Sequence, residues 1–174
     1  SRYVITTDTT IALGSTPSRI DISRQGGEDS EGWGALFVHR LMTNSDVAAS
    51  HTGLQIRTEV PAQAKVGDRL TLRYIITADR DYEWVRLTAP RAACFEPTKQ
   101  LSGYRHQGGL SYCLSQRDTG EDFFFERVPR GTYIITSEVY ADRRGSYTTG
   151  IASIECLYAP EYTGHTADTN IVIE

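Results

Sequence analysis

The sequence contains none of the short motifs that carry the commonest catalytic and cofactor chemistries. A Gly-X-Ser-X-Gly nucleophile elbow, a phosphate-binding P-loop, a dinucleotide-binding glycine fingerprint and a complete calcium-binding loop are all absent. The four histidines are far apart, and none lies at metal-ligand spacing from another: they are His39, His51, His106 and His165. We therefore expect no enzymatic activity, no catalytic residues, no bound metal and no cofactor.

Lysine is scarce as well. Lys65 and Lys99 are the only lysines, so arginine supplies nearly all of the positive charge, and the arginines are scattered along the chain. The net charge is −4 at pH 7 and the sequence pI is about 5.6. Because nucleic acid binding requires a concentrated basic surface, this balance argues against nucleic acid as the main partner. We expect the arginines to be solvated or to contribute to a protein-binding surface.

Long apolar segments are missing too. No stretch approaches the roughly 20 apolar residues of a transmembrane helix. The first residues lack the charged and apolar regions of a signal peptide. The chain begins with Ser1 rather than methionine, which we interpret as a piece of a larger protein or a mature product. The localisation is therefore not readable from these residues directly.

Cysteine is limited to Cys94, Cys113 and Cys156, so at most one internal disulfide can form. There is no Cys-X-X-Cys pair, which argues against a zinc site. We expect the cysteines to act as small apolar residues in strands. A bridge between Cys113 and Cys156 stays open if their strands prove to be neighbours.

Helical periodicity is absent, whereas alternation of polar and apolar residues recurs along the chain. Residues 69–76 alternate before a polar turn, and residues 84–87 are expected as the return strand. Residues 132–140 and 146–158 form further strands, with Gly150 at a bulge or a close approach. The chain has 174 residues, 39% of them hydrophobic, which is enough to bury a core. These features predict an all-β fold, an antiparallel two-sheet β-sandwich.

A polar, glycine-rich break at residues 25–32 divides the chain, and an apolar strand at 33–38 follows it. Regular alternation begins at Gly53. We therefore predict two segments. Residues 1–52 supply edge strands or the end of a preceding domain, and residues 53–174 form the compact sandwich.

Two clusters invite a functional interpretation, each with a structural alternative. Asp118, Glu121 and Asp122 beside Gly120 could bind a hard cation through carboxylate oxygens, although such a cluster is more often a solvated hairpin turn.

A second cluster is aromatic. Four aromatic side chains could form a sugar-stacking platform, or could instead pack across strands inside the sandwich. They are Tyr82, Trp84, Tyr104 and Tyr112.

Several sequence blocks, taken in order, resemble the C-terminal macroglobulin domain of bacterial alpha-2-macroglobulins. The blocks are GDRLTL at 67–72, ADRDYEWV at 78–85, RAACFEP at 91–97, LSGY at 101–104, FFF at 123–125, PRGTY at 129–133, GSY at 145–147 and YAPEY at 158–162. WGAL at 33–36 is similar to the entry into that region. The SGY and GGL variants resemble forms from Bacteroidetes-type bacteria.

This resemblance implies a macroglobulin-like β-sandwich, equivalent to the receptor-binding domain of the animal proteins. It implies a parent protein in the periplasm or at the cell surface that entraps proteases. The domain would be non-enzymatic and would dock against the thioester-type domain of the same chain. Its partners would be the other domains of the parent and, through the parent, proteases; the isolated domain would be a monomer. The thioester signature Cys-X-Glu-Gln is absent, because residues 94–97 end in proline, and the family carries it in the preceding domain.

The resemblance also suggests where an interdomain contact would lie. Tyr158, Glu161 and Tyr162 are the candidate contact residues. We expect Tyr158 to pack into the core, because its strand has a buried pattern, and leave the position of Tyr162 open. The alternative function is a carbohydrate- or surface-ligand-binding β-sandwich module of a secreted or envelope protein.

Overall fold

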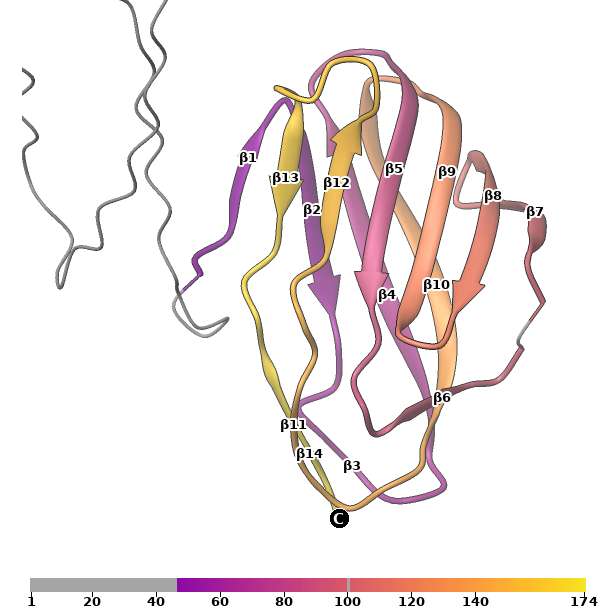
Figure 1. Cartoon of the computed structure of the whole chain (residues 1–174), viewed down its shortest axis with the longest axis vertical. Coiled ribbons are helices and arrows are strands. Elements are labelled where there is room, and N and C mark those ends of the chain that lie inside the picture. The colour runs from indigo at the N-terminus through magenta and orange to yellow at the C-terminus, as the bar shows by residue number, and fades with distance from the viewer. Residues whose placement is uncertain (1–46, 100) are drawn as a thin grey trace, which may run out of the picture. The chain divides into compact units, whose positions relative to one another are not determined.

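The computed structural model describes residues 47–99 and 101–174, which form β-strands joined by turns and loops (Figure 1). The strands are β1 (Ser50–Thr52), β2 (Leu54–Glu59), β3 (Gln63–Ala64), β4 (Arg69–Ala78), β5 (Tyr82–Pro90), β6 (Phe95–Pro97), β7 (Gly103–Gln107), β8 (Leu110–Arg117), β9 (Gly120–Val128), β10 (Gly131–Ala141), β11 (Gly145–Thr148), β12 (Ser153–Cys156), β13 (Thr163–His165) and β14 (Asn170–Ile173). Over these ranges no helix is long and apolar enough to cross a membrane.

The strands form two facing layers. Eleven strands are hydrogen-bonded in the order β6-β10-β4-β2-β1-β13-β12-β5-β9-β8-β7, and this sheet folds over so that β10, β4 and β2 lie behind β12, β5 and β9 (Figure 1). A small sheet of β11, β14 and β3 closes one end, where the chain terminates. The pairings are antiparallel except that of β14 with β3. The predicted all-β antiparallel sandwich is confirmed.

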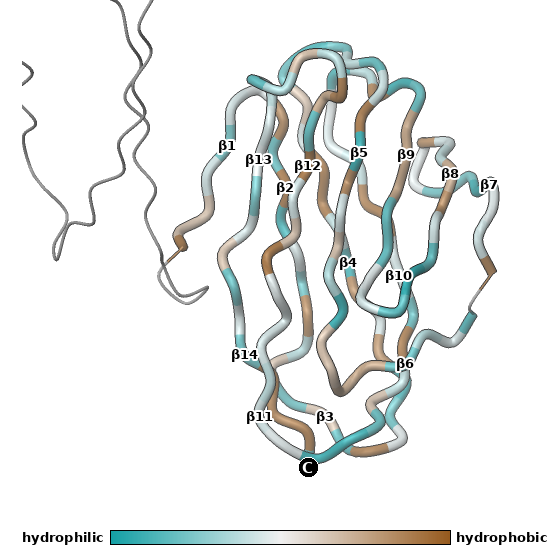
Figure 2. The backbone as a smooth tube through the Cα atoms, in the orientation of Figure 1, coloured by the Kyte–Doolittle hydropathy of each residue, from teal (hydrophilic) through white to brown (hydrophobic). Residues whose placement is uncertain are grey.

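The core lies between the layers and follows from alternation within the strands. In β4, Leu70, Leu72, Tyr74 and Ile76 are buried, while Thr71 and Arg73 are exposed. Figure 2 shows the corresponding change between hydrophilic and hydrophobic residues along the strands. Tyr74 meets Phe123 of β9 edge-on across the layers, with ring centroids 5.5 Å apart. Each fully buried large side chain contributes about 1.5–3 kcal/mol to folding, which makes this interior the main source of stability.

The partner of β5 differs from the prediction. Residues 84–87 do not return along β4, because β4 pairs with β2 and β10 whereas β5 pairs with β9 and β12. The turn at residues 79–81 instead carries the chain from one layer to the other. Alternation shows that a strand has a buried face, but not which neighbour supplies its hydrogen bonds.

The predicted long strand at residues 146–158 is also interrupted. It is divided into β11 and β12, and Gly150 lies in the break with a φ of 80°. A Cβ atom at Gly150 would lie 2.6 Å from the Pro90 side chain, so the predicted close approach is confirmed. The Gly150 N–H donates to the Asp168 carboxylate, which holds the chain in this break.

The cysteines are free thiols in the described part of the chain. Cys113 lies on β8 and Cys156 on β12, with β9 and β5 between these strands. A bridge between them is therefore excluded. Cys94 and Cys156 are buried, as expected of small apolar residues.

The segment before residue 47 lies outside the described residues, and with it the predicted strand at 33–38, the glycine-rich break and His39. β1 pairs with β13 and β2, so residues 50–52 are part of the sheet. The division into residues 1–52 and 53–174 remains a prediction.

Candidate functional site

The acidic cluster at the β8–β9 turn does not form a cation site. Glu121 points into the sandwich, is 5% exposed, and accepts hydrogen bonds from Gln116 Nε2 (2.6 Å) and Ser137 Oγ (2.9 Å). Asp122 is paired instead with Arg117 at 2.8 Å. Within residues 47–99 and 101–174, no group of three or more His, Cys, Asp or Glu side chains could hold a metal ion. The hairpin-turn interpretation holds for exposed Asp118, but Glu121 is a buried carboxylate.

The four predicted platform residues do not share a surface. Tyr82 and Tyr112 are buried, and Tyr112 packs against Phe123 of β9. Trp84 and Tyr104 are exposed but lie on β5 and β7, strands separated by β9 and β8. Of the two alternatives, the shared platform does not hold, whereas packing inside the sandwich holds for Tyr82 and Tyr112.

The predicted contact residues lie on the loop between β12 and β13. Two successive turns build this loop: the Ala159 N–H donates to the Cys156 carbonyl, and the Tyr162 N–H donates to the Ala159 carbonyl. Pro160 occupies the second position of the later turn, where its restricted φ is favourable. Glu161 is exposed on this turn.

Tyr158 does not pack into the core. Its side chain is 81% exposed, because β12 ends at Cys156 and the turn directs the following residues outward. The Tyr158 ring meets the Trp84 ring edge-on, with centroids 6.3 Å apart and planes at 89°. The buried pattern of the sequence continues only as far as Cys156, which explains the wrong prediction for Tyr158.

Tyr162 is half-buried and anchors the loop. Its ring packs against Tyr82 with centroids 5.4 Å apart, and the Arg80 guanidinium lies 4.9 Å from the Tyr162 ring centroid. Arg80 Nη1 also donates to the Tyr162 hydroxyl at 3.2 Å. Below them, the Tyr82 hydroxyl donates to the Asp79 carboxylate. Burial, followed by this hydrogen bond, raises the pKa of Tyr82 to about 12.

Trp84 completes the surface, although the sequence named it only among the four aromatic residues with two open alternatives. Its side chain is 48% exposed and its backbone has a φ of 55°. The Trp84 carbonyl accepts a hydrogen bond from the Leu157 N–H at 2.8 Å, which attaches the β12–β13 loop to β5. A signal was present in the sequence: Tyr82 and Val85 are apolar but three residues apart, which breaks the two-residue alternation.

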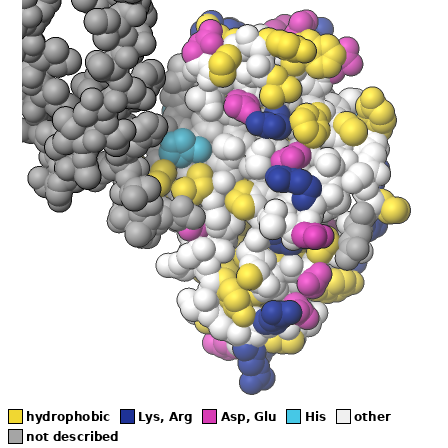
Figure 3. Space-filling view, in the orientation of Figure 1, with side chains coloured by type: hydrophobic (Ala, Val, Ile, Leu, Met, Phe, Trp, Pro, Cys, Tyr) yellow, Lys and Arg dark blue, Asp and Glu magenta, His cyan; other side chains and the backbone are white. Residues whose placement is uncertain are grey.

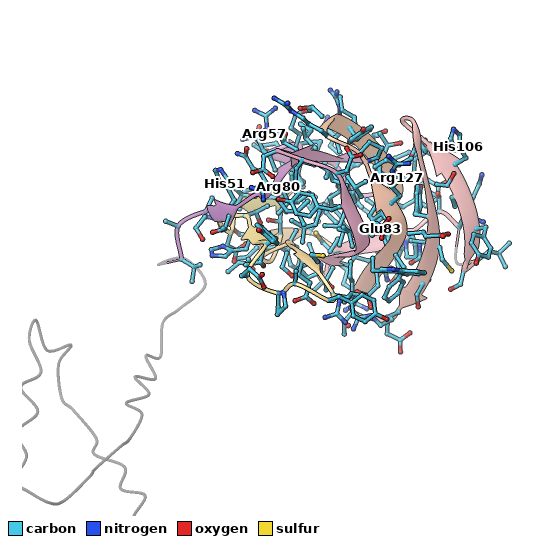
Figure 4. All side chains as sticks on the ribbon, turned by 90° about the horizontal axis from the view of Figure 1, so that it is seen from above. His51, Arg57, Arg80, Glu83, His106 and Arg127 are labelled. Atoms are coloured by element: carbon cyan, nitrogen blue, oxygen red, sulfur yellow. The ribbon has the colours of Figure 1, made fainter. Side chains whose placement is uncertain are left out.

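We call this region the Trp84 surface. It comprises three exposed apolar side chains, Trp84, Leu157 and Tyr158, with a polar rim of Arg80, Glu83, Arg127, Glu161 and Tyr162. In Figure 3 hydrophobic side chains gather near the end of the sandwich where the β12–β13 loop lies. Figure 4, which views the molecule from above, labels Arg80, Glu83 and Arg127 of this rim. A hollow of about 650 Å³ opens between Arg80, Trp84 and Tyr158.

The Asp79 carboxylate, which pairs with Arg80 of the rim, makes the stability of the fold depend on pH in the acid range. The Arg80 guanidinium and then the Tyr82 hydroxyl lower the pKa of Asp79. A carboxylate with a lowered folded-state pKa stabilises the fold above its unfolded pKa of about 3.9, and this contribution is lost as the pH falls through the folded value. We therefore expect Asp79→Asn to reduce the melting temperature by a constant amount between about pH 5 and 7, because this range lies above the unfolded pKa of the carboxyl group.

The difference between the wild-type and Asp79→Asn chains should close as the pH falls below about 4. Thermal unfolding followed by circular dichroism across this range measures it. Asp118→Asn, at an exposed carboxylate of the β8–β9 turn, is the control and should show little difference at any pH. A gap between wild type and Asp79→Asn that stays constant down to pH 2 would contradict the role given to this carboxylate.

The fold and the surface together define a macroglobulin-type β-sandwich domain with exposed aromatic side chains at one end. The family model of the bacterial alpha-2-macroglobulin MG10 domain matches residues 37–161. The chain belongs to this family. A search of curated proteins gave no match.

Solved structures show the same fold. Native alpha-2-macroglobulin from Escherichia coli, spanning domain MG7 to the C-terminus, is 13% identical with a TM-score of 0.63, over 75% of this chain and 25% of that one. The Y1175G mutant of Salmonella alpha-2-macroglobulin is 15% identical with a TM-score of 0.61, over 74% of this chain and 10% of that one. Trypsin-activated Escherichia coli alpha-2-macroglobulin is 12% identical with a TM-score of 0.61, over 74% and 11%. The chain thus spans a quarter or less of the length of these relatives.

Proposed function

We propose that this chain is a non-enzymatic docking domain of a bacterial alpha-2-macroglobulin-type protein that inhibits or entraps proteases. The observation that carries the proposal is the Trp84 surface, an exposed aromatic surface at one end of a domain whose family occurs within larger chains. The solved relatives include Escherichia coli alpha-2-macroglobulin activated by trypsin and by porcine elastase. By analogy, the parent of this chain would meet proteases in the periplasm or at the cell surface.

The proposed partner is the thioester-type domain of the same parent chain. Contacts between domains of one chain typically bury about 600–1,500 Å² and resemble transient protein interfaces. Tyr158 is suited to such a contact because its ring is large, exposed and limited to two side-chain torsions. Glu161 would form part of the polar rim, and Tyr162 would hold the loop in position through Tyr82 and Arg80. Docking would support the conformation of the neighbouring domain until cleavage of the parent releases it.

The arrangement of the rings argues against the carbohydrate-binding alternative. A flat sugar-stacking platform consists of coplanar exposed rings, whereas the planes of Trp84 and Tyr158 lie at 89°. The rings are therefore better suited to enter a shaped protein surface than to cover the flat face of a sugar.

Loss of the Tyr158 ring is expected to weaken protease entrapment by the parent. We expect Tyr158→Ala in the full parent chain to lower the fraction of trapped protease several-fold, since an exposed ring that becomes buried on docking carries about 2 kcal/mol or more when it is a hot spot. The 174-residue chain alone should not inhibit any protease. Both are measured by protease activity on a large substrate.

The matched control is Tyr104→Ala, since Tyr104 is 86% exposed and lies on β7, away from the Trp84 surface. It should leave entrapment unchanged. Equal loss with both variants, or potent inhibition by the 174-residue chain alone, would refute the docking proposal. Binding of the chain to a polysaccharide, lost in Tyr158→Ala, would favour the carbohydrate-binding alternative instead.

A further inference from the structure

The backbone of Trp84 has a conformation that L-residues rarely adopt. Its φ of 55° lies in the left-handed region, and within residues 47–99 and 101–174 no other residue except glycine has a positive φ. For a bulky aromatic residue this conformation is a true outlier, and such strain persists only where other interactions impose it. The position therefore requires an explanation.

The consequence of this conformation is that the indole side chain faces solvent and does not pack in the core. In β5, Tyr82 and Val85 are both buried although they are three positions apart, and the two residues between them, Glu83 and Trp84, are both exposed. Regular alternation would place Trp84 on the same buried face as Tyr82. The left-handed residue breaks the alternation, so the ring faces outward while Val85 returns to the interior.

The paired strand has the same break at the same register. In β9, Phe125 and Val128 are buried while Glu126 and Arg127 between them are exposed. Tyr82 lies opposite Val128, and Val85 lies opposite Phe125. Both strands therefore turn two consecutive residues outward at one place, which is a built feature of the sheet and not a local irregularity.

The contacts within the chain do not explain why this residue is a tryptophan. The Leu157 N–H donates to the Trp84 carbonyl, and Cys156 Sγ donates to the Glu83 carbonyl. Any residue at position 84 has a backbone carbonyl that could accept this hydrogen bond, and glycine would adopt the positive φ without strain. The aromatic contact of the Trp84 ring is an edge contact with Tyr158, whose own ring is 81% exposed.

The ring also has the surroundings of an interface anchor. It lies between two hollows, one of about 650 Å³ and one of about 370 Å³, and both are lined by Glu83, Trp84 and Arg127. Tryptophan, tyrosine and arginine are the residues that most often dominate interface energies, with a rim of less important contacts around them. A ring that stands between two hollows can enter a pocket while neighbouring groups of the partner fill the hollows.

We propose that the Trp84 side chain anchors the docking surface by inserting into a pocket on another domain of the same parent chain. This inference rests on the proposed function. The related chains are four or more times longer than the segment matched here, so neighbouring domains are joined to this one at high effective concentration. The pocket must be apolar and must contain a hydrogen-bond acceptor for the indole Nε1–H, which has no partner among the described residues.

Trp84→Gly separates an anchoring role from a structural one. Glycine relieves the strain of the positive φ, and this relief offsets the lost packing of the half-exposed indole, so the melting temperature of the 174-residue chain should change little. In the full parent chain, the same variant should raise hydrogen exchange of the β12–β13 loop about tenfold, because the docked state that protects the loop is lost. Trp84→Phe, which keeps an apolar ring but removes the indole N–H, should cause a smaller increase in exchange. Tyr104→Gly is the control: it should lower the melting temperature slightly and leave loop exchange unchanged.

The outcomes distinguish this inference from the proposed function. If Trp84→Gly lowers the melting temperature more than Tyr104→Gly and leaves loop exchange in the parent unchanged, Trp84 is structural and the inference is wrong. If the loop is protected in the parent and Trp84→Gly does not reduce that protection, docking stands but its anchor lies elsewhere. If the wild-type loop exchanges equally in the parent and in the 174-residue chain, docking itself fails. If protection of the loop from hydrogen exchange disappears on dilution, the Trp84 surface contacts a second copy of the chain, and the proposed partner is wrong.

Discussion

Phe123→Ala is expected to lower the free energy of unfolding by about 3–5 kcal/mol, the usual cost of removing a fully buried phenylalanine. Phe123 is 1% exposed, and its ring contacts both Tyr74 of β4 and Tyr112 of β8. The substitution therefore leaves a cavity at the point where the two layers meet. Because small domains are stable by only about 5–15 kcal/mol, the loss is a large fraction of the total.

The neighbouring Phe124 provides a matched control. It has the same side chain on the same strand but faces outward and is 38% exposed. Phe124→Ala removes less buried surface and leaves no interior cavity, so we expect a loss of about 1 kcal/mol or less. Urea unfolding of the two variants measures the difference. Equal losses would show that the assignment of inward and outward faces in β9 is wrong.

Gly53→Ala is expected to lower the free energy of unfolding by about 2–4 kcal/mol, the sum of a left-handed backbone and an overpacked contact. Gly53 joins β1 to β2 with a φ of 76°, which glycine adopts readily and alanine does not. An added Cβ would lie 2.1 Å from the Tyr82 hydroxyl and 2.9 Å from Tyr162 Cδ1. The clash falls on the two tyrosines that hold the β12–β13 loop.

Gly67→Ala separates the two causes. Gly67 has a φ of 90°, but a Cβ there would meet no atom within 4 Å. This variant should carry only the conformational cost of about 1–2 kcal/mol. Thermal unfolding of both variants, together with acrylamide quenching of Trp84 fluorescence in a Trp33→Phe background, measures stability and disturbance of the surface. A loss no greater for Gly53→Ala than for Gly67→Ala would contradict the close packing described at Gly53.

The fold class was predictable because its signal is local. Alternation in residues 69–76 and 132–140 marks strands with one buried face, and β4 and β10 cover these ranges. The close approach at Gly150 was predictable for a similar reason, since a glycine in a strand pattern often marks one. The family resemblance was carried by ordered short blocks, and the family model confirms it over residues 37–161.

The site was predicted only in part. The sequence indicated the β12–β13 loop through Tyr158, Glu161 and Tyr162, and whether these residues contact another domain remains a prediction. Burial of Tyr158 was wrong, because a strand pattern does not show where the strand ends. Trp84 was named only in the sugar-platform alternative and not beside Tyr158, because the sequence does not show that β5 pairs with β12.

The sequence by itself determined that this chain is an all-β domain with an apolar interior and without the known motifs of catalysis. These properties depend on composition and on neighbours within a few residues, which act before any long-range contact forms. The tertiary structure alone decided that β5 pairs with β9 instead of β4, that Glu121 is buried, and that Trp84 and Tyr158 meet at one end of the sandwich. Trp84 and Tyr158 are far apart in the chain, and only the pairing of β12 with β5 within one layer brings them together.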